Sequence, residues 1–243
     1  MLKSKEKLLN LNYSDVANRT YSVGKYDLPY ISCKMEAYPD YIALYSEKND
    51  YHKTENTAVS FYQYDVTFDG IFSIYNAIYY DVPKLKDYYI KRLKGVKYII
   101  APDYSQCGDM HEAEKLYRIF KARIVSVWLT TELGITVIPN ITYADEKGFE
   151  NMLDGMENTN TVAFSTKGSM RSDYMMEMMR QAVKISVDRL DLKAIIVYSD
   201  QTENDDIYSI FDYALKNNVK LIVPSNSLRE RNIILRKNGY GKI

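Results

Sequence analysis

The chain has 243 residues, of which 46% are hydrophobic, and its 32 Lys and Arg balance 32 Asp and Glu. This length suits one large core, and a net charge of zero excludes a whole-molecule field that would attract nucleic acid or an anionic membrane. The two cysteines, Cys33 and Cys107, exclude a disulfide framework, and no apolar run reaches the roughly 20 residues of a membrane span.

The first 56 residues are expected to form an irregular N-terminal β extension that caps the main domain, residues 57–243. Within this extension, the segments YDLPYIS and DYIALYSE predict short strands of a hairpin or barrel cap around the charged loop KNDYHKTEN. The strand TAVSFYQYD at 57–65 then opens the main domain. A helical region follows from Gly70 to about Leu93, and Pro83 interrupts it.

From residue 95 onward, short apolar runs rich in β-branched residues alternate with stretches of helical period. This alternation predicts an α/β fold with parallel strands, and their near-continuous apolarity is typical of strands covered on both faces. We therefore predict a TIM-barrel-like fold of about six to eight βα units. The predicted strands lie at 96–103, 135–143, 161–166, 192–200 and 219–225.

Three helices are predicted between these strands. The first carries apolar residues at three- and four-residue steps from Met110 to Val127, and Gly134 is placed to end it. The second spans about 171–190, with a methionine cluster that is typical of core packing. The third spans 205–217. The basic tail after Ser225 predicts either a phosphate-binding arm or a solvated terminal helix.

Polar residues stand where the predicted strands stop. In α/β proteins with parallel strands, ligands bind beyond the carboxyl ends of the strands, so these residues form the predicted site. The predicted catalytic residues are Asp103, Asp145 and Lys167. The predicted ligand-binding residues are Asn140, Tyr143, Ser165, Thr166, Gly168, Tyr198 and Ser225.

A second hypothesis concerns a metal ion. Carboxylate oxygens are the ligands that Mg²⁺ and Mn²⁺ prefer, so Asp65, Asp103, Asp145 and Asp200 are the candidate ligands. The alternative is that these residues cap the helices that follow the strands, because Asp, Asn, Ser and Thr are the preferred N-caps.

The stretch STKGSM at 165–170 joins hydroxyl groups, a cation and a flexible backbone before a helix, which is suitable chemistry for a phosphate. The alternative is a glycine turn beside a surface lysine. Cys107 and His111 could share one helix face, but this spacing alone does not make a nucleophile and its base.

From about residue 58 to 226, the order of motifs resembles the uncharacterised family called domain of unknown function 4417. The matching motifs are FYQYD with VPKLKDYY, GVKYIIAPDYS, GITVIPNITYAD, VAFSTKGSM and AIIVYSD. The family favours an acidic pair near FYQYD, a tryptophan near Tyr143 and a histidine near Lys167. This sequence departs from that pattern at Gln63, Tyr143 and Lys167. The resemblance implies a bacteriophage or mobile-element protein whose strand-end motifs form its functional face.

The sequence supports two hypotheses of function. In the first, the strand ends bind a phosphorylated small molecule or a nucleic-acid end, with metal-assisted phosphoester chemistry if the protein is an enzyme. In the second, the protein is not an enzyme and binds a host or phage protein through a surface rich in its 24 tyrosines. The N-terminus lacks the apolar segment of a secretory signal, so the host cytoplasm is the expected location and no membrane partner is expected.

Overall fold

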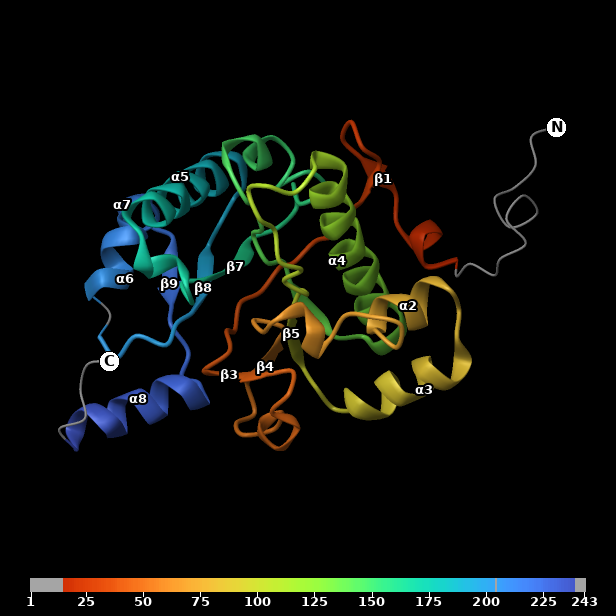
Figure 1. The fold of residues 1–243 in the computed structure, drawn as a ribbon, viewed down its shortest axis with the longest axis horizontal. Coiled ribbons are helices and arrows are strands. Elements are labelled where there is room, and N and C mark those ends of the chain that lie inside the picture. The colour runs from red at the N-terminus through yellow and green to blue at the C-terminus, as the bar shows by residue number, and fades with distance from the viewer. Residues whose placement is uncertain (1–14, 204, 239–243) are drawn as a thin grey trace.

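A computed structural model describes residues 15–203 and 205–238, in which helices and parallel strands alternate along the chain (Figure 1). The first sheet contains β3 (Tyr41–Leu44), β4 (Thr57–Ser60), β5 (Tyr98–Ile100) and β6 (Thr136–Ile138), all parallel and in sequence order. The second sheet contains β7 (Thr161–Ser165), β8 (Ala194–Tyr198) and β9 (Lys220–Ile222), again parallel and in sequence order.

Single parallel bridges link the two sheets at both of their edges. Beyond β6, Asn140 pairs with Ala163 of β7, and the amide of Ile141 donates to the carbonyl of Ala163 over 3.0 Å. Beyond β9, Ser225 pairs with Tyr41 of β3, and its carbonyl accepts from the amide of Ile42 over 2.8 Å. The predicted mixed α/β fold with parallel strands is therefore confirmed. The predicted TIM-barrel-like arrangement of about six to eight βα units is not confirmed.

Seven α-helices lie among the described residues, together with several short 3-10 helices. They are α2 (Ile74–Tyr79), α3 (Pro83–Arg92), α4 (Glu112–Leu133), α5 (Asp173–Arg189), α6 (Asp205–Ile210), α7 (Asp212–Lys216) and α8 (Ser227–Lys237). No helix in this described part of the chain combines the length and apolarity that crossing a membrane would require.

Local sequence explains where several helices begin and end. The helix predicted before Gly134 is α4, and Gly134 ends it in the left-handed region at φ 64°. Pro83 occupies the first turn of α3, where its missing N–H costs no hydrogen bond. The single helix predicted at 205–217 is instead α6 and α7. Phe211 separates them with φ −97° and ψ 13°, and its buried ring packs against Phe164 at 5.6 Å.

The strands separate two hydrophobic clusters, because successive side chains of a strand point to opposite faces. The outer cluster joins the strands to the helices. The inner cluster draws side chains from the strands and from the segment just before β3. Its buried members are Cys33, Met35, Ile42, Leu44, Ala58, Tyr62, Tyr98, Ile100, Ile138, Ala163, Ile196 and Tyr198, and the partly buried Tyr38 and Ile222 pack against it.

The N-terminal region differs from the prediction. The segment containing Tyr41–Leu44 was expected in a hairpin or cap, but it forms β3 and pairs in parallel with β4 over its whole length. A short antiparallel pair does occur earlier, between β1 (Ser22–Val23) and β2 (Leu28–Pro29). The correction has a physical cause: pairing with β4 buries Ile42 and Leu44 in the inner cluster.

Asn226 fixes the start of α8 and provides a test of this arrangement. Its side-chain oxygen accepts from the amide of Arg229 over 2.9 Å, and its side-chain nitrogen donates to the carbonyl of Ser199 over 2.8 Å. Because Asn226 is fully buried, Asn226→Ala should lower the free energy of unfolding by about 2–4 kcal/mol, through a lost cap and an unpaired carbonyl. The control Asn217→Ala, at an exposed helix end, should cost less than about 0.5 kcal/mol. Urea unfolding that gives equal costs for both would contradict this role.

Candidate functional site

An open cleft of about 1140 Å³ lies at the carboxyl ends of the strands. Residues that follow β4, β5, β7 and β8 line it, and α8 contributes a further wall. Six of the residues predicted for the site line this cleft, namely Asp103, Ser165, Thr166, Lys167, Gly168 and Asp200. The parallel strands thus bring together residues that lie up to 97 positions apart in the sequence.

Asp103 is half-buried in the cleft and is held by two neutral side chains. The side-chain nitrogen of Asn140 donates to its carboxylate over 2.8 Å, and the hydroxyl of Thr142 donates over 3.4 Å. The hydroxyl of Tyr62 in turn donates to the side-chain oxygen of Asn140 over 2.7 Å, which fixes the orientation of that amide. Asn140 therefore serves the predicted site by positioning Asp103.

This environment raises the pKa of the Asp103 carboxyl to about 6. Burial is the largest cause, since it disfavours the charged form, and the nearby charge of Asp65 adds to it. The hydrogen bonds from Thr142 and Asn140 act in the opposite direction. A carboxyl group with this pKa can both accept and donate a proton near neutral pH, which is the property that general acid–base catalysis requires.

The stretch 165–168 forms a turn at the end of β7. Gly168 adopts φ 85°, and the backbone amide of Lys167 donates to the hydroxyl of Ser165 over 3.3 Å. The exposed Lys167 also donates through Nζ to the carbonyl of Tyr62 over 3.3 Å, so its ammonium group reaches across toward the end of β4.

Two details of this turn differ from the prediction. Thr166 is buried, and its hydroxyl is paired with that of Ser199 at 2.8 Å, so its side chain is committed within the protein. The turn also does not lead directly into the next helix, because a 3-10 helix at Ser169–Arg171 precedes α5. The Lys167 and Gly168 backbone therefore does not lie at the N-terminus of α5.

The basic tail after Ser225, predicted as a phosphate-binding arm or a terminal helix, forms helix α8 and supplies residues of the cleft. Asn232 donates to the carbonyl of Asp200 over 2.9 Å, and Arg236 forms an ion pair with Glu203 at 2.6 Å. Arg231 also lines the cleft, and its side chain has no ion pair or hydrogen bond with another described residue. Four residues of α8 line the cleft from one face of the helix, namely Arg231, Asn232, Leu235 and Arg236. Their spacing is the sequence feature that could have identified this face.

Two of the predicted aspartates are committed to other contacts. Asp145 caps the 3-10 helix Glu146–Glu150 by accepting from the amide of Gly148, and it pairs with Lys115 at 2.6 Å. This lysine holds the pKa of Asp145 below its usual value. Asp65 pairs with Arg118 at 2.6 Å and accepts from the hydroxyl of Ser105 over 2.8 Å. Asp145 is therefore a helix cap, as the alternative to the metal hypothesis predicts.

These contacts bear on the metal hypothesis. Within residues 15–203 and 205–238, no group of three or more His, Cys, Asp or Glu side chains could hold a metal ion. The four aspartates Asp65, Asp103, Asp145 and Asp200 thus do not converge on one ion as that hypothesis requires, because two of them face cations of α4 instead.

Four predicted ligand-binding residues lie outside the cleft lining, and one of them is Asn140, which holds Asp103. The other three make contacts within the protein. Tyr143 packs its ring against Phe149 at 5.4 Å, and burial raises the pKa of its hydroxyl. Tyr198 belongs to the inner cluster and packs against Tyr62 at 5.1 Å. Ser225 forms the bridge to β3, and its hydroxyl donates to Glu230 over 3.0 Å.

Comparison with known proteins gives one family and two relatives. The family model described as Domain of unknown function (DUF4417) matches residues 20–214. The chain is 26% identical to a Gene 1 protein of Mycobacterium phage L5 over 171 residues, which cover 70% of this chain and 69% of that protein. It is 25% identical to a Gene 1 protein of Mycobacterium phage D29 over 118 residues, which cover 49% of this chain and 43% of that protein. No solved structure matches the chain.

The raised pKa of Asp103 predicts a measurable pH dependence of stability. An acid whose pKa is higher in the folded state stabilises that state fully below its unfolded pKa, and this contribution is lost as pH rises through the folded value of about 6. At pH 7 the ionised Asp103 therefore costs stability. Asp103→Asn should raise the free energy of unfolding at pH 7 by about 1–3 kcal/mol and have little effect at pH 4. Urea unfolding across this range measures both, and a destabilised variant at pH 7 would refute the prediction.

Proposed function

The chain belongs to the family described as Domain of unknown function (DUF4417), and we propose that its strand-end cleft binds a phosphorylated ligand, a nucleotide or a nucleic-acid end. One observation carries this proposal. Of the three cations that line the cleft, Arg236 is paired with Glu203, whereas Lys167 and Arg231 have no carboxylate partner among the described residues. These two cations are the groups that would contact a phosphate.

The other cleft residues favour a nucleotide over a simple phosphate. Four carboxylates, those of Asp103, Asp200, Glu203 and Asp206, also line the cleft. They suit the amino groups of a base or the hydroxyl groups of a sugar, which donate hydrogen bonds to carboxylates. A ligand that carries both a phosphate and such donors matches this mixture of charges, and the cleft is large enough for it.

Tyr64 adds a further argument for a base. Its side chain lines the cleft although it is 86% exposed, so one face of the ring has no protein neighbour to pack on it. Stacking of a base on an exposed aromatic ring contributes about 1–3 kcal/mol and tolerates any base. A base on Tyr64 with its phosphate toward Lys167 and Arg231 is the arrangement that we propose.

If the protein is an enzyme, Asp103 is the group that would move a proton during phosphoester chemistry, because its pKa lies near 6. A Mg²⁺ or Mn²⁺ ion would enter together with the ligand. Mg²⁺ is commonly held by one or two carboxylates plus phosphate oxygens, so such an ion does not need a preformed site of three protein ligands. Asp103 and Asp200 are the proposed carboxylates.

The proposed site also agrees with a closed arrangement of the strands. We infer that the two sheets and their linking bridges form one seven-stranded barrel-like ring, with the inner cluster as its interior. The single bridges at Asn140 and Ser225 support this inference, as does an inner cluster that draws side chains from each of the seven strands. In such a ring the cleft would occupy the mouth.

The proposal is tested by thermal shift measurements with a panel of mononucleotides, 5′-phosphorylated oligonucleotides and sugar phosphates, with and without Mg²⁺. A compound at a hundred times its dissociation constant should add about 2.7 kcal/mol to the apparent stability. Lys167→Ala and Arg231→Ala should each weaken its binding about ten- to hundredfold, since each removes a charge-assisted contact.

The matched control is Lys147→Ala, which removes an exposed lysine that does not line the cleft. This variant should bind as the unchanged protein does. No stabilisation by any phosphorylated compound, or equal weakening in the control, would refute the proposed function.

A further inference from the structure

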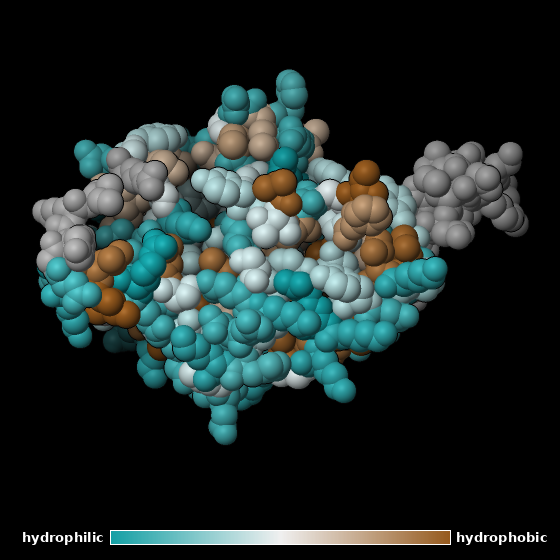
Figure 2. Space-filling model, turned by 60° about the horizontal axis from the view of Figure 1, so that its bottom comes forward, coloured by the Kyte–Doolittle hydropathy of each residue, from teal (hydrophilic) through white to brown (hydrophobic). Residues whose placement is uncertain are grey.

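The loop between β4 and α2 buries Phe68 and turns Asp65 and Asp69 inward, but it leaves three other apolar residues exposed. Asp65 and Asp69 are partly buried and face α4. Val66, Ile71 and Phe72 are instead 87%, 81% and 75% exposed. Figure 2 shows hydrophobic side chains standing out of this face of the molecule among hydrophilic ones. Exposed apolar groups of this kind are typical of a protein–protein interface.

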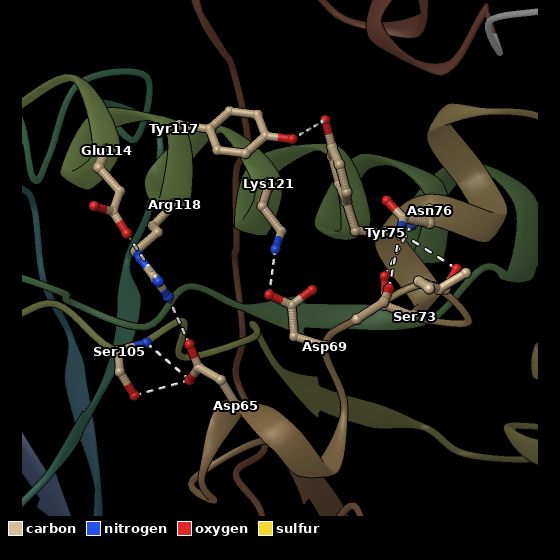
Figure 3. A network of polar contacts seen from close by, with 12 residues as sticks. Asp65, Asp69, Ser73, Tyr75, Asn76, Ser105, Glu114, Tyr117, Arg118 and Lys121 are labelled. Carbon is tan, nitrogen blue, oxygen red and sulfur yellow. Dashed lines mark hydrogen bonds and ion pairs between the residues drawn. The ribbon is translucent and has the colours of Figure 1, made fainter.

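Contacts beneath the loop hold it in this orientation (Figure 3). Asp65 pairs with Arg118, and Asp69 pairs with Lys121, both on α4. Lys121 is buried, and its ammonium group lies 4.2 Å from the centre of the Tyr104 ring. Removing either partner of a largely buried ion pair is costly, so these pairs fix the loop to α4 with Val66, Ile71 and Phe72 exposed.

Neighbouring helices extend the same surface. Tyr117 of α4 is 48% exposed and meets Tyr75 of α2 edge to face at 6.0 Å. The hydroxyl of Tyr89 in α3 donates to the carbonyl of Phe72 over 2.7 Å, which joins the loop to α3. We call the set Val66, Ile71, Phe72 and Tyr117 the apolar ridge.

The two ends of the apolar ridge differ in charge. The end at Phe72 adjoins α3 and the turn after it, where Lys84, Lys91 and Lys94 are exposed and Asp87 is the one acidic residue of α3. At the other end, Asp65 and Glu114 share the single cation Arg118, which leaves an excess negative charge there. Figure 3 shows Glu114 and Arg118 at one side of the network and Ser73, which follows Phe72, at the other.

We propose that the apolar ridge is a self-association surface, on which a second copy of this chain packs about a two-fold axis. Such an axis places the Val66 end of one copy against the Phe72 end of the other, because an isologous interface pairs each patch with itself in reverse. The lysines of α3 in each copy then meet the acidic end of its partner. The zero net charge of the chain adds no repulsion between copies.

Sedimentation velocity over a range of protein concentrations tests this proposal. The unchanged protein should form a dimer, and Ile71→Asp and Phe72→Asp should each weaken dimerisation at least about tenfold, while thermal stability stays unchanged. The control Ile234→Asp alters a side chain that is 58% exposed on α8 and should leave dimerisation unchanged. A protein that stays monomeric at every concentration, or a dimer that Phe72→Asp does not weaken, overturns the proposal.

Charge reversal tests the two-fold arrangement itself. A variant with Lys91→Glu and Lys94→Glu and a second variant with Glu114→Lys should each dimerise poorly alone, since like charges meet twice in either homodimer. A mixture of the two should form a heterodimer, because both ends of its interface then pair opposite charges. Failure of the mixture to associate would overturn the two-fold packing.

Discussion

The structure depends on one constraint: the seven strands from β3 to β9 all run in the same direction. Each strand must leave the core at the same edge, so the segments after β4, β5, β7 and β8 meet there even though helices separate them in the sequence. Side chains alternate between the inner and outer clusters along each strand. The last residues of the strands therefore become polar at the point where the inner cluster ends, and the cleft forms over it.

Helix α8 shows how the same constraint brings a distant segment to the cleft. Ser225 pairs with β3, and the buried Asn226 binds both the first turn of α8 and the carbonyl of Ser199. These contacts direct α8 along the residues that follow β8, and Arg231 then lines the same cleft as the turn that carries Lys167. The polar residues at the strand ends and on α8 thus fall into two groups. Asp65, Asp145 and Thr166 have polar or charged side-chain partners, whereas Lys167 and Arg231 have no carboxylate partner among the described residues.

Residue pattern alone predicted the elements whose signals are local. Apolar residues at three- and four-residue steps, followed by Gly134, predicted α4. Six apolar runs rich in β-branched residues predicted strands β4 to β9. The parallel pairing of β3 with β4 was not predicted, because it depends on burial in the inner cluster. The residues on either side of β3 in the sequence do not reveal that cluster. The site was predicted in part, since strand ends identified Asp103 and Lys167. Residue type could not show that Lys115, thirty positions before Asp145, would pair with it, or that α8 would turn toward the cleft.

The central claim is that a phosphorylated ligand binds in the cleft at the strand ends. The most direct measurement is the titration of backbone amide NMR signals with a mononucleotide. Binding as proposed should shift the signals of Tyr64, Lys167, Gly168 and Arg231 together with one dissociation constant, and leave those of the apolar ridge unchanged. Shifts that are confined to residues outside the cleft, or the absence of any shift at saturating nucleotide, would contradict the claim.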